Sequence, residues 1–174
     1  MPAIALKHFL RRTAGYAEII EHKLLAPNNN PQACIFYYHR VSDIPFRDRR
    51  LDDRNVTPVL LERHIAALAK SCEVVPLTEI KSRFASGSSP TRPIVSLTFD
   101  DGYANFRHSV LPILERYSVP AMLSVVTSFV GFASPTPFDR WAQTNRERAP
   151  LDAWKMASWD DLEACIRSGL VTIG

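Results

Sequence analysis

A near-continuous apolar run at residues 94–99, Ile-Val-Ser-Leu-Thr-Phe, is the feature that most constrains the fold of this chain. A strand with one face in water alternates apolar and polar side chains, whereas a strand covered on both faces is an almost unbroken apolar run. Residues 94–99 therefore predict a central strand in a sheet with helices on both faces, which is an α/β fold.

Apolar strands and helical segments alternate along the rest of the chain. Thr57 and Pro58 have the residue types of an N-cap and a first helical turn, and Ser158 opens a second helix that Gly169 ends. This order implies parallel strands joined by crossover helices, with functional side chains at the carboxyl ends of the strands. The predicted strands are 33–38, 73–77, 94–99, 121–126 and 170–174. One predicted helix begins at Pro58 and has an apolar stripe of Leu60, Leu61, His64, Ile65 and Leu68. Three more are predicted: from a Thr78 cap to near Gly87, over 104–117 with a bend at Pro112, and over 158–166. A polar loop is predicted over 41–55.

The composition indicates a globular protein and excludes several classes of function. The chain has 174 residues, 46% of them hydrophobic and 22% charged, with a formal net charge of +3. The small basic excess is scattered and has no interleaved aromatic residues, so nucleic-acid binding is not expected. Cys34, Cys72 and Cys165 are odd in number and widely spaced, which predicts reduced thiols rather than disulfides or a structural zinc site.

Residues 1–30 predict an amphipathic helix and linker ahead of a main domain over 31–174. Charged residues interrupt every apolar run there before it reaches the length of a signal-peptide core. No stretch of the chain approaches the ~20 apolar residues of a membrane span. We expect the helix to pack on the body of the protein, with peripheral contact to a membrane surface as the alternative. With no export signal visible, a cytoplasmic location is favoured.

The C-terminal half has an unusual layout. The connection over 128–157 is rich in proline, and its length predicts an active-site lid or a disordered insert. The chain then ends at Gly174 within an apolar strand, and a closed α/β barrel needs roughly 200 residues or more. We therefore expect an incomplete barrel in a C-terminally truncated domain.

Two adjacent carboxylates, Asp100 and Asp101, directly follow the central strand, and Gly102 comes next. Because neighbouring side chains alternate across a strand, one acid can bind a divalent metal while the other acts as a base near the metal-bound water. Gly102 permits a tight turn and a close approach of substrate to the backbone. The alternative is an ordinary turn at the end of a strand, where Asp and Gly are common.

The string Leu-Thr-Phe-Asp-Asp-Gly-Tyr at 97–103 resembles the first signature motif of the polysaccharide deacetylases, the NodB-homology family of carbohydrate esterases. The segments 38–41 (YHRV), 110–131 and 156–174 also resemble the layout of that family, in the same order. The resemblance covers about residues 33–174, and the combination is more specific than any one motif.

The resemblance implies a distorted (β/α) barrel that removes N-acetyl groups from the amino sugars of a polysaccharide with a divalent metal, usually zinc. By position, Asp100 resembles the general base that activates the metal-bound water, and Asp101 resembles a metal ligand. The backbone N–H of Tyr103 resembles a donor that stabilises the oxyanion. Such a set suits amide hydrolysis, which needs a nucleophile, a Lewis acid and a proton for the leaving amine.

The two other metal ligands of the family are histidines in a HxxxH-like motif that follows a segment like 168–174. None of the five histidines of this chain falls there. A catalytic zinc normally takes three protein ligands, so we expect the chain as given to lack tight metal binding and turnover.

His39 is the histidine of greatest interest, because it ends a predicted strand as Asp100 does. Both side chains can then face one pocket, and members of the YHRV-like branch place a histidine near the active site, which implies a catalytic acid or a substrate contact. His64 is expected to be a packing or surface residue, and His108 to lie on the exposed side of its helix.

Three tryptophans are candidates for stacking on a sugar ring. Trp141 and Trp154 lie in the long connection, whereas Trp159, beside the Ser158 cap, is expected to pack in the core.

Metal-dependent hydrolysis of N-acetyl groups in a glycan is thus the first functional prediction. A non-catalytic carbohydrate-binding or scaffolding remnant of the same fold is the alternative. Phosphoryl transfer is weaker, because there is no Gly-rich phosphate loop and no DxD arrangement after the strand. The residues do not distinguish among chitin, peptidoglycan, poly-N-acetylglucosamine and lipid-linked sugars.

Overall fold

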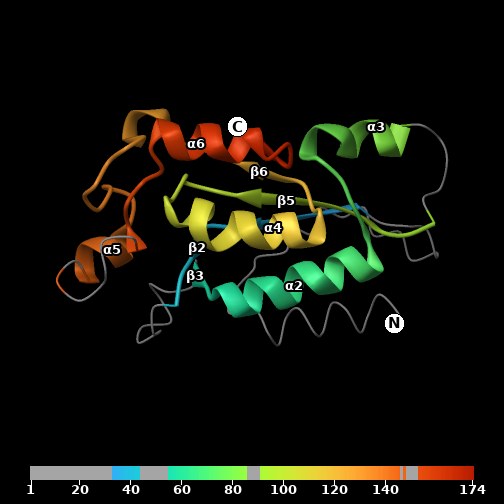
Figure 1. Ribbon diagram of the computed structural model, residues 1–174, viewed down its shortest axis with the longest axis horizontal. Helices are drawn as coiled ribbons and strands as arrows, with labels where there is room; N and C mark the ends of the chain where they lie inside the picture. Colours follow the sequence, from blue (N-terminus) through green and yellow to red (C-terminus); the bar gives the residue numbers. More distant parts are fainter. Residues whose placement is uncertain (1–32, 44–54, 86–90, 146, 148–152) are drawn as a thin grey trace.

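A parallel β-sheet with helices on both sides forms the centre of the computed structural model, which describes residues 33–43, 55–85, 91–145, 147 and 153–174 (Figure 1). The described strands form an open sheet rather than a closed barrel, as the sequence predicted. Its order is β1 (Ala33–Tyr38), β5 (Ile94–Phe99), β6 (Ala121–Leu123) and β7 (Val171–Ile173), and β4 (Glu73–Val74) also pairs with β5. Every residue of β5 is buried, which confirms the central strand.

A second, two-stranded sheet lies where a loop was predicted. β2 (Arg40–Val41) pairs in parallel with β3 (Asn55–Val56), and the Ser42 N–H extends the pairing by donating to the Val56 carbonyl at 3.0 Å. All four strand residues are buried, so their backbone groups need partners that a loop would not supply. Residues 44–54 lie outside the described part of the chain.

Two helices begin where the sequence predicts. In α2 (Pro58–Ser71) the Thr57 hydroxyl accepts a hydrogen bond from the Leu60 N–H, and the buried stripe includes Leu61, Ile65 and Leu68. In α6 (Trp159–Arg167) Ser158 and Asp161 form a reciprocal capping box, and Gly169 follows with a φ of 73°. In Figure 1 α6 lies above β5 and α2 below it, and both helices contribute buried side chains to the same core.

Other predicted elements differ in type or length. Thr78 lies inside the 3-10 turn η1 (Leu77–Glu79), which leads into α3 (Ile80–Ala85), so the predicted Thr78 cap is wrong. The predicted helix over 104–117 is a π-helical segment, η2 (Phe106–Val110), followed by α4 (Leu111–Tyr117). Pro112 lies in the first turn of α4; it has no N–H to donate to the preceding ladder, which explains the break. Gly87 lies outside the described residues.

The connection after β6 contains the 3-10 turn η3 (Thr127–Phe129) and the short helix α5 (Arg140–Asn145). Its two ends are joined by hydrogen bonds from the Gly131 N–H to the Ala157 carbonyl (2.8 Å) and from the Met156 N–H to the Phe132 carbonyl (2.9 Å). The described part of the connection is therefore a closed, hydrogen-bonded loop, and α5 lies beyond the carboxyl end of β5 (Figure 1).

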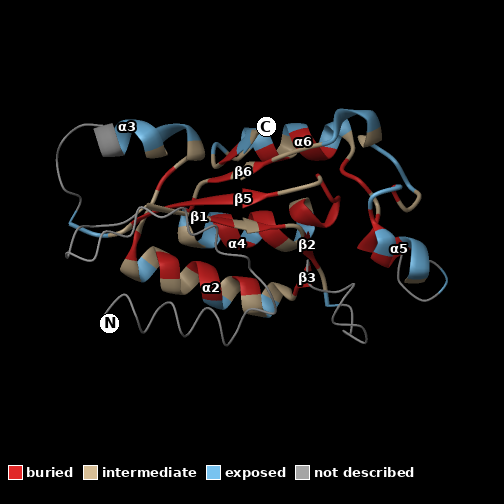
Figure 2. Ribbon diagram, turned by 180° about the vertical axis from the view of Figure 1, so that it is seen from behind, coloured by how far each residue is buried: buried red, intermediate tan, exposed pale blue. Residues whose placement is uncertain are grey.

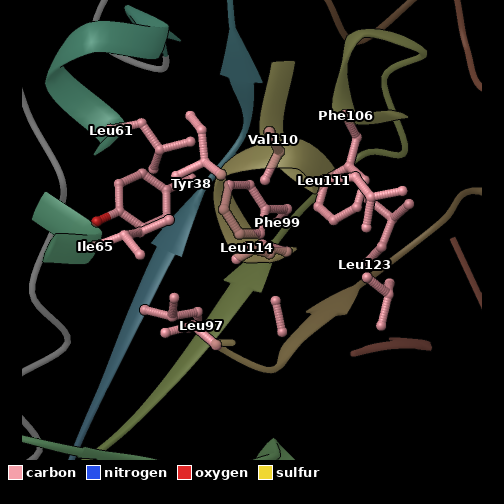
Figure 3. Close-up of a cluster of buried hydrophobic side chains, with 14 of the residues drawn as sticks. Tyr38, Leu61, Ile65, Leu97, Phe99, Phe106, Val110, Leu111, Leu114 and Leu123 are labelled. Atoms are coloured by element: carbon pink, nitrogen blue, oxygen red, sulfur yellow. The ribbon is translucent and has the colours of Figure 1, made fainter. Parts of the chain in front are cut away.

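The main hydrophobic core fills the space between the sheet and the helices (Figure 2). Phe99 stacks on Tyr38 and meets the edge of Phe106, with ring centroids 5.1 Å apart in each pair. Figure 3 shows these rings surrounded by aliphatic side chains from α2, α4 and the sheet, including Leu61, Ile65, Leu97, Leu114 and Leu123.

Cys34, Cys72 and Cys165 are thiols that are not joined in disulfides, as the sequence predicted. Cys72 and Cys165 are buried and Cys34 is half-buried; burial raises the pKa of the Cys72 thiol and raises that of Cys165 to about 11. Among the described residues, no helix combines the length and apolar character needed to cross a membrane. The predicted N-terminal amphipathic helix lies outside the described residues.

Candidate functional site

Two predicted site residues, Asp100 and His39, lie at the ends of neighbouring strands. β1 and β5 are parallel, with Tyr38 opposite Phe99, so each candidate is the first residue after its strand. The Asp100 N–H donates to the Tyr38 carbonyl at 2.7 Å, which continues the ladder by one bond. Both residues are half-buried. The register of two parallel strands therefore brings an acid and an imidazole to one edge of the sheet.

The surroundings of Asp100 act on its carboxyl group in opposite directions. Burial raises its pKa above the ordinary aspartate value, and the neighbouring Asp101 adds to that increase. The charge of His39 and a side-chain hydrogen bond with Ser124 favour the carboxylate and partly offset the rise. A half-buried carboxylate with a raised pKa is a stronger proton acceptor than one in water.

Asp101 and Gly102 turn the chain away from β5. Asp101 has a φ of 72° and Gly102 a φ of 78°, so both lie in the left-handed region. A Cβ on Gly102 would lie 3.1 Å from Cγ1 of Val125, so glycine is needed for space as well as conformation. The two acids are thus separated by this turn, and not by strand alternation as predicted, because β5 ends at Phe99.

Tyr103 follows the turn, and its backbone forms an isolated antiparallel bridge with Met156. The bonds of this bridge come from the neighbouring amides: the Ala104 N–H donates to Lys155 at 2.8 Å, and the Ala157 N–H donates to Gly102 at 2.9 Å. Within the part of the chain that the structure describes, the Tyr103 N–H has no hydrogen-bond acceptor. This N–H is therefore unpaired among the described residues, and Tyr103 as a whole is 5% exposed.

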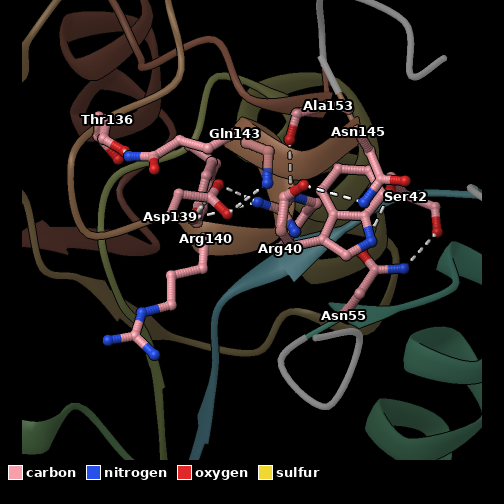
Figure 4. A network of polar contacts seen from close by, with 12 residues as sticks. Arg40, Ser42, Asn55, Thr136, Asp139, Arg140, Gln143, Asn145 and Ala153 are labelled. Atoms are coloured by element: carbon pink, nitrogen blue, oxygen red, sulfur yellow. Dashed lines mark hydrogen bonds and ion pairs between the residues drawn. The ribbon is translucent and has the colours of Figure 1, made fainter. Parts of the chain in front are cut away.

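A buried polar cluster joins this edge to the long connection, and the sequence had not predicted it. Arg40 forms an ion pair with Asp139 (Figure 4). The Tyr103 hydroxyl donates to the same carboxylate at 2.9 Å. Arg40 and Asp139 are 99 positions apart and no local pattern joins them. The only available signal was a charged residue, Arg40, two positions after the apolar strand 33–38.

The three tryptophans lie contrary to expectation. Trp141 and Trp154 are buried and form a small apolar cluster with Ala142 and Ala153. Trp159, predicted in the core, is 66% exposed because it occupies the first turn of α6, whose buried face begins at Asp161 and Leu162.

The other two described histidines lie as expected. His64 is buried, with its Nδ1 3.4 Å from the Tyr38 hydroxyl, and His108 is exposed.

The described residues do not make a zinc site by themselves. Among them there is no group of three His, Cys, Asp or Glu side chains that could hold a metal ion. A catalytic zinc takes three protein ligands, and Asp101 is a single candidate. A metal at this edge would need ligands from outside the described residues.

Comparison with known families gives a match over the C-terminal half of the chain. The sequence model of the polysaccharide deacetylase family matches residues 87–174, which include Asp100, Asp101 and Tyr103.

Individual relatives agree with the family match. The poly-beta-1,6-N-acetyl-D-glucosamine N-deacetylase of Escherichia coli K12 is 29% identical over 136 residues, which are 78% of this chain and 19% of that protein. A de-N-acetylase from Aggregatibacter actinomycetemcomitans has a similar structure, with a TM-score of 0.60 and 25% identity over 82% of this chain and 53% of that one. IcaB from Ammonifex degensii has a TM-score of 0.59 at 19% identity, over 83% of this chain and 52% of that one. The chain thus spans about a fifth of the curated relative and about half of each solved structure.

Proposed function

This chain belongs to the polysaccharide deacetylase family, and from that premise we propose that it supplies part of the active site of a hydrolase that removes N-acetyl groups from the amino sugars of a glycan. The similarity to an enzyme named for poly-β-1,6-N-acetyl-D-glucosamine supports an N-acetylglucosamine polymer as substrate. Chitin and peptidoglycan contain the same acetamido group and are the closest competitors.

One observation carries the proposal: Asp100 and His39 follow adjacent, in-register parallel strands. In the proposed reaction Asp100 takes a proton from the attacking water, and the water oxygen bonds to the acetamido carbon. The charge that develops on the carbonyl oxygen is stabilised by the Tyr103 N–H. His39 then gives a proton to the amine nitrogen as the C–N bond breaks, which leaves acetate and a free amino sugar.

A divalent metal, most simply zinc, is part of the proposal. When bound, it would supply a Lewis acid for the carbonyl. Asp101 is the ligand that the described residues offer. Its position directly after the proposed base would keep a bound metal and the proton acceptor at one edge of the sheet.

Replacement of the base is the sharpest test of this function. Asp100→Asn keeps the size of the side chain and removes its basicity, so in zinc-loaded, active protein we expect acetate release from a chitooligosaccharide or a poly-N-acetylglucosamine oligomer to fall about 10²- to 10⁴-fold. Asp160→Asn, at an exposed position in the first turn of α6, is the matched control and should keep the wild-type rate. Undiminished acetate release by Asp100→Asn would contradict the assignment.

A non-catalytic carbohydrate-binding role is the second candidate, favoured by the single metal ligand among the described residues. Titration with zinc, followed by an acetate assay, separates the two. Stoichiometric binding together with acetate release excludes the non-catalytic role. Binding of the oligosaccharide with no acetate released, with or without zinc, supports it.

A further inference from the structure

The Arg40–Asp139 pair is buried to an unusual degree for two charged side chains. Arg40 is 3% exposed and Asp139 is 7% exposed. The Nη2 atom of Arg40 pairs with Oδ2 of Asp139, and the Arg40 Nε donates to the Ala153 carbonyl at 2.6 Å. Figure 4 shows these contacts converging on one guanidinium group. Two points within the described connection, Asp139 and Ala153, are thus held by one side chain of β2.

Aromatic rings complete the surroundings of the guanidinium. The Arg40 Cζ atom lies 4.7 Å from the ring centroid of Tyr103 and 4.5 Å from that of Trp141. Both distances are within the range of cation–π attraction. Arg40 also places its Nη2 atom 3.3 Å from the Tyr103 hydroxyl. Tyr103 is therefore held on its ring face and at its hydroxyl.

Stability alone is a weak reason for such a pair. Removing two charges from water costs several kcal/mol per ion, and well-packed apolar residues of similar volume are often as stable as a buried ion pair. The polar atoms in the cluster do, however, impose directions that apolar packing would not. Asp139 accepts from the Tyr103 hydroxyl with Oδ2 and from the Ala142 N–H with Oδ1 at 2.9 Å, which fixes the carboxylate plane.

The position of the Arg40–Asp139 pair in the fold indicates what its directional hydrogen bonds are for. Arg40 directly follows His39 in the chain, and the side chain it holds belongs to Tyr103, whose backbone N–H is the proposed oxyanion donor. We propose that Arg40 and Asp139 are positioning residues, which hold Tyr103 so that its N–H stays available to the reacting carbonyl. This role rests on the proposed deacetylation.

Because Arg40 and Asp139 carry opposite charges, both can be replaced together in a double variant that tests the positioning role. In the double variant Arg40→Met and Asp139→Leu, the ion pair is replaced by apolar side chains of similar size, so neither charge is left buried alone. We expect a melting temperature close to that of wild type, a kcat lower by roughly 10- to 100-fold, and a KM changed much less, because a misplaced oxyanion donor acts in the transition state. The matched control is Arg116→Lys in the exposed Arg116–Glu62 pair, which should change neither constant.

A second variant keeps the proposal testable if the double variant fails to fold. Tyr103→Phe removes only the hydroxyl that donates to Asp139, and it should shift kcat in the same direction by a smaller factor. The direct readout is the amide NMR signal of residue 103 in the full chain: we expect its chemical shift and its hydrogen-exchange rate to change in both variants and to stay constant in Arg116→Lys.

The two readouts separate this role from the function on which it rests. A wild-type protein that binds zinc stoichiometrically and still releases no acetate counts against the deacetylase, whereas the residue-103 amide still tests the positioning. A folded variant with an unchanged residue-103 amide, or with wild-type kcat, would overturn the positioning role and leave the pair as a structural link.

Discussion

The main core and the small cluster beneath the connection are stabilised in different ways. The main core joins the sheet to α2, α4 and α6 with aliphatic and aromatic side chains. The small cluster contains four buried residues, Trp141, Ala142, Ala153 and Trp154, and borders a buried ion pair. Four side chains are too few for an independent core, so directional polar contacts must supply what apolar area does not.

This difference assigns separate tasks to the two regions. The main core holds the strands in register and so places Asp100 beside His39. The small cluster and its ion pair hold the connection over the same edge and fix Tyr103. Regions with few buried apolar contacts open at lower free energy than the global core, so the connection is expected to be the less stable unit.

Truncation of a core ring is the largest effect expected. Phe99→Ala removes a ring that packs on both Tyr38 and Phe106, and the free energy of unfolding should fall by about 3–5 kcal/mol. Trp154→Ala, in the small cluster, should cost less in global unfolding but speed hydrogen exchange in α5. Equal losses of unfolding free energy for the two variants in urea denaturation would show that the two regions unfold as one unit. That result would contradict the conclusion that they are stabilised separately.

Acid should lower the free energy of unfolding of the main core through protonation of His64. Burial lowers the pKa of this histidine to about 4, from an ordinary value of 6.5, so the native state keeps it neutral while the unfolded chain binds the proton. Stability from this group is complete above pH 6.5 and is lost as the pH falls toward 4, by on the order of 3 kcal/mol.

Denaturation curves between pH 7 and pH 4 measure this loss. His64→Gln should be less stable at pH 7 but flatter across the window, and His108→Gln, at an exposed position, should follow the wild-type slope. An unchanged slope in His64→Gln would assign the acid sensitivity to other groups.

A substitution in the turn at Gly102, between the two regions, should lower the free energy of unfolding least among the three changes. Gly102→Ala places a Cβ at a φ of 78° and 3.1 Å from Val125, and we expect a loss of about 1–3 kcal/mol in the free energy of unfolding. Gly131→Ala has a similar φ but no atom within 4 Å of the added Cβ, so it isolates the backbone strain from the clash. Equal losses in the two variants would show that the contact with Val125 is relieved without cost.

Local signals explain how much of the fold was predictable. Thr57, Pro58 and Ser158 act on amides within three residues, so their caps can be read from the sequence. The apolar run 94–99 by itself indicates a strand covered on both faces. The ends of the runs 33–38 and 94–99 placed His39 and Asp100 each at the end of a strand, whereas the pairing of β1 with β5 was not predicted.

The features that the sequence did not predict depend on contacts between residues far apart in the chain. Arg40 and Asp139 meet across 99 positions, and Trp159 is exposed because the helix that begins there presents another face to the core. The side-chain contacts of Tyr103 were likewise invisible, since only its backbone was implied by the family resemblance. The roles of Asp100, Asp101, His39 and Tyr103 in catalysis remain predictions.

The three cysteine thiols provide a built-in set of chemical reporters. Cys72 lies just after α2, Cys165 lies in α6 and Cys34 is half-buried in β1, so each marks a different part of the sheet and its helices. A thiol-specific reagent should label Cys34 first, whereas labelling of the other two requires the protein to open. Mass spectrometry of the labelled peptides would then time the opening of each helix in an unmodified sequence.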